Sequence, residues 1–359
     1  MRFPEFGGEW EREKLRDKCS FYSGGTPSSS NKLYYNGEIP FIRSGEISGD
    51  STELFLSEFG LNNSSAKMVD IGDLLLALYG ATSGQISISK IRGAINQAIL
   101  CIKSSYDNIF LKSVWEKHVD KILQAYLQGG QGNLSADIVK NLSFYFPSLD
   151  EQNKISKLIV LIDERIATQN KIIEQLQSLI KGIRVRLFSF DNYDIKYLGD
   201  LCSITTGKLD ANAMVENGKY PFFTCAEDTF RIDEYAFDTE ALLISGNGAN
   251  LGYIHYYNGK FNAYQRTYVL DKFSVEVMYL KYYLETFLNQ RINQEVNVGN
   301  TPYIVLSTLT KMKIKIPDIS QQRNIINVLS NLNLKLNQEK DILSAYQTQK
   351  AYLLRNLFT

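Results

Sequence analysis

The stretch DLLLALYGATSGQISI, residues 73–88, decides how the chain is organised, because a second version of it, ALLISGNGANLGYIHY, occupies residues 241–256. When residues 73–97 are placed over residues 241–265 without a gap, 7 of the 25 positions are identical. Chance alone gives about one or two identities in such a window. The match therefore predicts an internal repeat.

The similarity continues on both sides of this block and keeps the same order. Upstream, LRDKCS at residues 15–20 matches LGDLCS at residues 198–203. Downstream, Leu111-Lys112 matches Leu280-Lys281, Pro147 matches Pro317, and Leu187-Phe188 matches Leu357-Phe358. A coincidence of apolar strands and turn glycines is the alternative, but it does not explain why the helices and both tails match as well. We predict two copies of one unit.

Each copy is predicted to begin with short strands and to continue into helices. Apolar runs at residues 74–78 and 98–102, between turn residues, are typical of buried strands. Apolar residues then recur every three or four positions from Ile109 to Tyr126, which predicts a helix. The second copy offers the same series.

A long helix is predicted at the end of each copy. Ser148-x-x-Glu151 and Asp318-x-x-Gln321 resemble helix-capping sequences, and no proline interrupts the residues after either of them. The first helix, from Glu151 to Phe188, would be about 57 Å long at 1.5 Å per residue. An apolar stripe on such a helix needs a partner, and the other copy's helix is the obvious one. The residues predicted to pack between the helices are Ile155, Ile162, Ile166, Ile173, Leu176, Ile325, Leu332, Leu336 and Leu343.

The predicted fold class is α+β. Two similar globular domains are separated by a long antiparallel two-helix coiled coil, with an approximate internal two-fold axis. The predicted boundaries are 1–149 for the first globular domain, 150–190 for the first helix, 191–316 for the second globular domain and 317–359 for the second helix. The alternative is that each helix packs only on its own domain.

Composition argues against several classes of protein. Lys plus Arg equals Asp plus Glu at 39 each, so any basic surface must be local. No apolar run is long enough to span a membrane and no signal peptide is visible at the N-terminus. The four cysteines are scattered without a CxxC, which favours reduced thiols in the cytoplasm and no metal. Catalytic and cofactor-binding motifs are missing, so we expect no enzyme activity and no cofactor on this chain.

Two similar domains on a stiff rod suit a ligand that presents two separated sites. Double-stranded DNA is the leading case, because sites on one face of the duplex repeat about every 34–36 Å. Carbohydrate and protein ligands fit the same geometry.

The order of several motifs resembles a known family. They are WEREKLRDKCSFYSGGTPSSSNKLYYNGEIPFIRSGEI at residues 10–47, GDLLLALYGATSG at 72–84, FPSLDEQNKISKLIVLIDERI at 146–166 and, in the second copy, IPDISQQRNIINVLSNLNLKL at 316–336. Together they resemble the specificity subunit of type I restriction-modification systems, over essentially the whole chain. One departure is that GGTP (24–27) has no intact counterpart, since TGKL stands at 206–209.

The resemblance implies a non-catalytic subunit whose two target-recognition domains each read half of a split DNA sequence. It implies that the helices set the gap and dock two methyltransferase subunits, which bind S-adenosylmethionine and methylate adenine N6. A motor-nuclease subunit would add restriction. The alternative is a coiled-coil scaffold that assembles proteins without reading DNA. A self-contained methyltransferase is disfavoured by the missing motifs.

The repeat also sorts candidate DNA contacts. Residues shared by both copies should be scaffold or phosphate contacts, whereas base readers should differ. The glycines 80, 84, 248 and 252 are shared and predict backbone turns. The candidate DNA-binding residues are Arg43, Ser44, Tyr79, Thr82, Ser83, Lys90, Arg92, Asn247, Asn250, Tyr253, His255, Lys260 and Arg266.

Simpler roles are open for each candidate. Asn247 and Asn250 are ordinary turn residues as well as possible adenine readers. The basic residues could be solvated surface charges, and His255 could pack in the core. The shared Gln97 and Gln265 are expected to make buried hydrogen bonds to the backbone rather than to read adenine.

Overall fold

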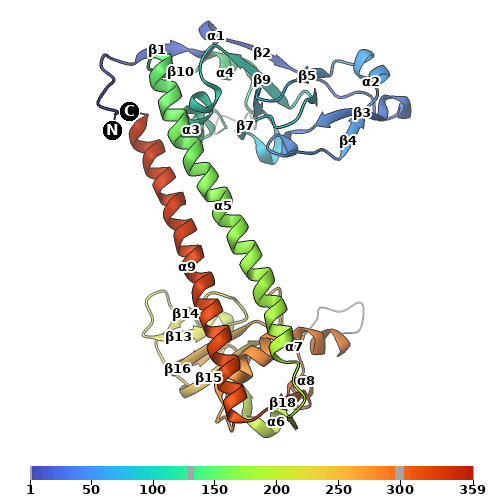
Figure 1. Ribbon diagram of the computed structural model, residues 1–359, viewed down its shortest axis with the longest axis vertical. Helices are drawn as coiled ribbons and strands as arrows, with labels where there is room; N and C mark the ends of the chain where they lie inside the picture. The colour runs from blue at the N-terminus through green and yellow to red at the C-terminus, as the bar shows by residue number, and fades with distance from the viewer. Residues whose placement is uncertain (1, 128–132, 296–302, 359) are drawn as a thin grey trace. The chain divides into compact units, whose positions relative to one another are not determined.

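The computed structural model describes residues 2–127, 133–295 and 303–358 (Figure 1). The chain forms two compact units: unit 1 is Met1–Asn170 with Ile342–Thr359, and unit 2 is Lys171–Asp341. Each unit holds one globular head together with part of both long helices. The predicted boundaries at 149, 190 and 316 separate heads from helices instead and stay a prediction. We call residues 11–146 head 1 and residues 194–316 head 2.

The described residues of head 1 form three small sheets. The first pairs β1 (Glu11–Lys14) with β10 (Ser143–Phe146). The second has the order β2 (Cys19–Ser23), β9 (Ile99–Ser104), β6 (Leu74–Ala77), β7 (Ile86–Ile88). The third has the order β4 (Leu54–Leu56), β3 (Tyr35–Ile42), β8 (Gly93–Ile95), β5 (Lys67–Val69). All four residues of β6 are buried, so the buried strand predicted at residues 74–78 is confirmed.

The helices of head 1 lie around these sheets. They are α1 (Leu15–Lys18), α2 (Glu58–Asn62), α3 (Asn108–Leu127) and α4 (Ala136–Asn141), with 3₁₀ turns at Lys32–Tyr34, Ser44–Glu46 and Gly80–Thr82. Helix α3 is the helix predicted from the spacing that begins at Ile109, and it packs beside β7.

Head 2 repeats the same arrangement with one larger sheet. Strands β11 (Asp194–Tyr197) and β18 (Lys313–Ile316) pair. The six-stranded sheet has the order β12 (Ser203–Thr206), β17 (Thr267–Asp271), β15 (Phe237–Ser245), β16 (Ile254–Ala263), β13 (Tyr220–Phe223), β14 (Phe230–Ile232). Its helices are α6 (Leu198–Leu201), α7 (Val277–Glu295) and α8 (Leu306–Thr310), with a 3₁₀ turn at Ala211–Ala213. The α+β prediction and the repeat are both confirmed.

The two heads differ where one long strand is interrupted. Strand β16 runs unbroken through the residues that correspond to β7, a break and β8 in head 1. The break faces Gly72, which has a φ of +92° that an extended strand does not allow. The backbone N–H of Asp70 donates to Asp73 Oδ2 at 2.8 Å and closes this turn. The counterparts of these residues in β15 instead pair regularly with β16.

The long helices are α5 (Leu149–Leu187) and α9 (Ile319–Leu357). Their starts are capped as predicted, since Ser148 Oγ accepts from the N–H of Glu151 at 3.4 Å and Asp318 Oδ1 from that of Gln321 at 2.9 Å. The Glu151 carboxylate does not complete a capping box, because it is buried and binds Arg2 at 2.7 Å.

Within unit 1, the first turns of α5 lie beside the last turns of α9 (Figure 1). Asp163 pairs with Lys350 at 2.8 Å, and the guanidinium of Arg165 lies 5.9 Å from the ring centre of Tyr346. Because the partner's number falls as the α5 number rises, the two segments are antiparallel, as predicted.

The ends of both helices also close the heads. In unit 1 the ring of Phe358 lies 5.2 Å from that of Phe110. In unit 2 the ring of Phe188 lies 5.8 Å from Tyr279 and 5.3 Å from Tyr283. Each head is therefore held by the end of the helix that comes after the other head in the chain.

The predicted packing residues lie on the stripe to different depths. Ile155, Ile162, Ile173 and Ile325 are buried. Ile166, Leu176, Leu332, Leu336 and Leu343 are half-buried. Ile155 and Ile325 belong to the head cores, so packing on the head and packing between helices share one stripe. In the described residues no helix is apolar and long enough to cross a membrane.

Candidate functional site

The turn after β6 is a closed loop of backbone hydrogen bonds. The N–H of Ala77 donates to Gln85 O at 2.9 Å, and the N–H of Gly84 donates back to Ala77 O at 2.9 Å. Inside the loop, the backbone N–H of Ser83 donates to Gly80 O at 3.1 Å and that of Gln85 donates to Thr82 O at 2.9 Å. We call residues 77–85 turn 1.

The same four hydrogen bonds recur in head 2, each shifted by 168 residues. The backbone N–H of Ser245 donates to Tyr253 O at 2.9 Å, and the N–H of Gly252 donates to Ser245 O at 2.8 Å. Leu251 donates to Gly248 O at 3.2 Å and Tyr253 to Asn250 O at 3.0 Å. Residues 245–253 are therefore turn 2, built on the same backbone as turn 1.

The shared glycines make this backbone possible, as predicted. All four have φ between +78° and +86°. A Cβ on Gly84 would lie 2.9 Å from Val119 Cγ2, and one on Gly252 would lie 2.8 Å from Asn289 Oδ1. A Cβ on Gly80 or Gly248 would meet nothing within 4 Å. One glycine of each turn therefore faces the helix and the other faces open space.

The side chains that differ between the turns are partly exposed. Tyr79, Gln85 and Tyr253 are exposed, whereas the others are half-buried, namely Thr82, Ser83, Asn247, Asn250 and Leu251. Ser83 Oγ donates to Leu78 O at 2.9 Å, and Asn250 Nδ2 donates to Cys225 O at 3.3 Å. Asn247 forms an isolated backbone bridge with Tyr303. Ser83 and Asn250 thus help to hold their own turns.

A second loop meets each turn. Arg43 and Ser44 follow β3 in head 1, and the chain after β13 takes the same place in head 2. The Arg43 guanidinium pairs with Glu46 at 3.0 Å and with Glu53 at 2.5 Å, and these carboxylates raise the Arg43 pKa. Arg43 would have to exchange these partners to bind a guanine.

His255 is held against the corresponding loop of head 2. Its Nε2 lies 2.9 Å from Ala226 O, and its ring lies 4.8 Å from that of Tyr253. Burial lowers the pKa of His255, which favours the neutral imidazole. His255 and Tyr253 together form an aromatic edge beside turn 2.

The basic candidates are not gathered into one patch. Lys90 and Arg92 lie beyond the far end of β7 from turn 1, and Arg92 pairs with Asp70 at 3.1 Å. Lys260 lies on β16, 4.0 Å from Asp238 and 4.7 Å from the Tyr235 ring centre. The carbonyl of Arg266 accepts from the N–H of Gly246 at 2.8 Å, which places Arg266 beside turn 2. The Arg266 side chain is exposed.

The prediction for the shared glutamines is wrong in its detail. Gln97 and Gln265 are exposed, and each side chain bonds another side chain rather than buried backbone. Gln97 Oε1 accepts from Thr26 Oγ1 and Gln265 Nε2 donates to Asp210 Oδ1, both at 2.6 Å. Thr26 and Asp210 lie on the loops after β2 and β12, so the two glutamines bind equivalent loops.

The departure at TGKL does not change the scaffold. A Cβ on Gly24 would lie 1.7 Å from Ile95 O, and one on Gly207 would lie 1.9 Å from Ala263 O. Ile95 and Ala263 are themselves equivalent in the repeat. Gly207 therefore takes the place of Gly24, and only the residues after it differ.

Each turn borders a hollow against the helix beneath it. In head 1 the hollow, about 500 Å³, lies between turn 1, α3 and the loop after β3. In head 2 the hollow, about 490 Å³, lies between turn 2, α7 and the loop after β13. We call them hollow 1 and hollow 2. Hollow 1 is mainly apolar, while hollow 2 contains Arg184, Glu227, Lys281 and Glu285.

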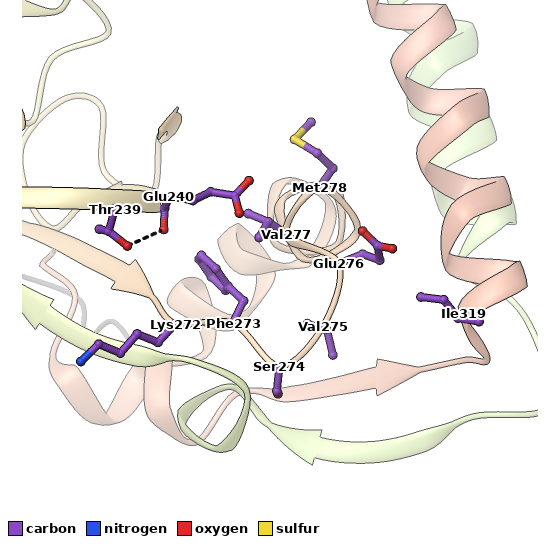
Figure 2. A pocket seen from close by; sticks show the side chains of 10 residues that line it. All are labelled: Thr239, Glu240, Lys272, Phe273, Ser274, Val275, Glu276, Val277, Met278 and Ile319. Carbon is purple, nitrogen blue, oxygen red and sulfur yellow. Dashed lines mark hydrogen bonds between the residues drawn. The ribbon is translucent and has the colours of Figure 1, made fainter. Parts of the chain in front are cut away.

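A third hollow, about 650 Å³, lies elsewhere in head 2 (Figure 2). Figure 2 shows Glu240 and Glu276 beside the start of α7, with Lys272 pointing away from them. None of the predicted site residues lines it. Two carboxylates at its wall would repel phosphates, so we do not place the nucleic-acid interface there.

The loop after β13 was not among the predicted site residues. The signal was present, because IPFIRSGEI (39–47) and YPFFTCAED (220–228) share Pro, Phe and Glu at three positions. The offset there is 181 rather than 168, and the intervening chain differs in length. Among the described residues no cluster of side chains could hold a metal ion.

The chain is similar in sequence to a known protein family. A family model described as "Type I restriction modification DNA specificity domain" matches residues 7–178 and again 191–344. The specificity subunit of the Escherichia coli type I restriction enzyme EcoDI is 40% identical over 143 residues, which is 40% of this chain and 32% of that protein. The MjaIX specificity subunit of Methanocaldococcus jannaschii is 23% identical, covering 98% of this chain and 93% of its own length.

Solved structures share the fold. The type I restriction-modification S subunit of M. genitalium superposes with a TM-score of 0.65 at 17% identity, covering 100% of this chain and 99% of its own. A chain from a structure of the type I restriction-modification system, studied for complex assembly and conformational transition, superposes with a TM-score of 0.63 at 17% identity. The match covers 99% of this chain and 98% of that one.

Proposed function

The chain belongs to the type I restriction modification DNA specificity family, and from this premise we propose that its two heads read the two halves of a split DNA target. The family match also agrees with the predicted role as a specificity subunit rather than an enzyme. It favours DNA recognition over a coiled-coil scaffold that assembles proteins without DNA.

The observation that carries the proposal is the pair of turns. Their backbones make the same four hydrogen bonds, but the exposed side chains differ. A reader of two unlike half-sites needs this combination, because the backbone sets the distance to the duplex and the side chains select the bases. The exposed Tyr79 and the half-buried Thr82 would act in head 1. In head 2 the exposed Tyr253 and the half-buried Asn247 and Asn250 would act, with Asn250 giving up its hydrogen bond to Cys225 O.

The basic residues would contribute in a different way. Lys90 and Arg266 are exposed, and Arg92 and Lys260 sit in exposed pairs that phosphates could replace. A phosphate bound by any of them would release counterions and increase the salt dependence of binding. In this proposal these side chains supply affinity and carry no sequence preference.

We further propose that α5 and α9 set the gap between the half-sites and dock two methyltransferase subunits. Each helix is 39 residues long. Exposed apolar side chains on both helices, among them Leu161, Leu179 and Leu334, offer contact area to such partners. S-adenosylmethionine would bind the partners, and adenine N6 methylation would occur there, in the cytoplasm. A motor-nuclease subunit would add cleavage.

The test is to map adenine methylation in a host with this chain intact and with an early stop codon in its gene. We expect a two-part methylated sequence to disappear with the chain. The purified complex with its methyltransferase partners should restore the mark in vitro. Methylation by that complex irrespective of sequence would overturn the recognition role.

The gap is tested separately by inserting four residues, about one helical turn, into both long helices. We expect the spacing between the half-sites to change while each half stays the same. Equal insertions in the loop between α5 and β11 are the control. An unchanged gap would contradict the role of the helices.

A further inference from the structure

The helices beneath the two turns carry the same ion pair. In α3, Lys112 Nζ lies 2.6 Å from Glu116 Oε1. In α7, Lys281 pairs with Glu285 in the same i, i+4 arrangement. The two pairs are equivalent in the repeat, and their glutamates line hollow 1 and hollow 2 respectively.

In head 2 a second cation completes the pair. The guanidinium of Arg184, near the end of α5, lies 2.9 Å from Glu285 Oε2. It also lies 5.8 Å from the ring centre of Tyr282. The Glu285 carboxylate thus faces a lysine at one oxygen and an arginine at the other.

In head 1 the described residues supply no second cation. The repeat that matches Phe188 with Phe358 places Leu354 of α9 where Arg184 stands. Glu116 Oε2 and Glu285 Oε2 are both buried without a hydrogen bond within the described part of the chain, but Glu285 Oε2 has the Arg184 guanidinium 2.9 Å away and no described residue places such a cation beside Glu116 Oε2. A carboxylate oxygen removed from water without a donor is unfavourable, so the site favours a ligand that brings one.

Hollow 1 has the shape and chemistry to admit that ligand from outside. Among the described residues that line it, Glu116 is the one ionisable side chain. Its apolar wall contains Ile47, Ile86, Val119 and Leu123. An arginine suits this combination, because its aliphatic stem packs on apolar surface while its guanidinium reaches a carboxylate.

We propose that hollow 1 is a receptor for an arginine side chain presented by a partner protein. Head 2 contains the internal precedent, since Arg184 lines hollow 2 and pairs there with the equivalent carboxylate. A nucleic-acid phosphate is disfavoured as the occupant because the carboxylate repels it. The proposal does not depend on the DNA-reading role, since it concerns the hollow beside turn 1.

The test uses the full chain labelled with 5-fluorotryptophan and the probe N-acetylargininamide. The chain has two tryptophans. Trp115 lines hollow 1 and donates its indole N–H to Gly84 O at 2.8 Å, so its ¹⁹F resonance should report binding, while Trp10 serves as reference. We expect a saturable shift of the Trp115 resonance with the probe and none with N-acetylleucinamide.

Glu116→Gln should weaken probe binding at least about tenfold, because it replaces the charge-assisted contact with a neutral one. Glu285→Gln is the matched control and should leave binding at hollow 1 unchanged. Equal binding by Glu116→Gln and the unaltered chain, or equal loss in both variants, would overturn the proposal.

Two exchanges sharpen the test. Leu354→Arg should supply Glu116 with a cation from α9, as Arg184 does for Glu285, and should abolish probe binding. Arg184→Leu should free the Glu285 carboxylate in hollow 2 and raise the calorimetric stoichiometry from one probe to two. If Leu354→Arg does not fold, Arg184→Leu still decides, and a stoichiometry unchanged at one would count against the proposal.

Discussion

Head 1 and head 2 share a turn whose backbone hydrogen bonds are the same, but the hollow beside the turn is apolar in one and charged in the other. The difference teaches which parts of the repeat are constrained. Two positive-φ glycines and four backbone bonds fix the turn. Apart from Ser83 and Asn250, which donate to backbone carbonyls, the side chains that differ between the turns can change without loss of these bonds.

The largest expected effect comes from the residues that close the heads. Phe188→Ala should destabilise head 2 and Phe358→Ala should destabilise head 1, each by about 3–5 kcal/mol, because a buried aromatic ring is removed. Hydrogen exchange read by mass spectrometry should show lost protection in the head concerned. Equal loss in both heads for either variant would contradict the assignment of one helix end to each head.

Gly84→Ala should cost about 2–4 kcal/mol of unfolding free energy, because strain at positive φ adds to the clash with Val119. Gly80→Ala, with the same strain but open space, should cost about 1 kcal/mol. Urea denaturation measures both. The pair separates the two causes, and a Gly80→Ala cost as large as that of Gly84→Ala would show that helix packing does not matter.

A smaller change is expected in DNA selection. Asn250→Ala should relax the preference for one base of the head 2 half-site by about 1–3 kcal/mol of discrimination. Thr82→Ala, at the equivalent place, should act only on the head 1 half-site. Binding of the methyltransferase complex to a set of single-base variants of its target measures both. An effect of either change on the opposite half-site would break the separation.

The smallest expected effect is on pH dependence. Because burial lowers the His255 pKa in the folded chain, His255 contributes stability that is fully present above its unfolded pKa of about 6.5. That contribution is lost as the pH falls from the unfolded pKa through the lower folded pKa, because between these two values the unfolded chain binds the proton and the folded chain does not. His255→Gln should reduce the difference in stability between pH 7.5 and pH 5. An unchanged difference would argue that His255 is not the group responsible.

Local signals carried much of the fold. The match of residues 73–88 with 241–256 predicted the repeat, and the hydrogen bonds of both turns confirm it. The helix starts at Ser148 and Asp318 were also visible, because capping depends on residues close in sequence. These features need no knowledge of distant contacts.

Long-range contacts were beyond the sequence. Strand β7 follows turn 1 and ends at Ile88. Just beyond it, the carbonyl of Ser89 accepts from the N–H of Gly72, which lies in the positive-φ turn before β6. Arg43 looked like a free guanine reader, but Glu53, ten residues further on, holds it. Gln97 and Gln265 bond side chains that lie 71 and 55 residues earlier in the chain, at Thr26 and Asp210, and such contacts leave no local signal.

The central claim is that one backbone framework presents two different readers. The most direct measurement is the DNA sequence methylated by the full complex after turn 2 is given the side chains of turn 1, with Asn247→Tyr, Asn250→Thr and Tyr253→Gln. We expect the half-site read by head 2 to change while the other half and the gap stay the same. Two unchanged halves, or a change in the half read by head 1, would contradict it.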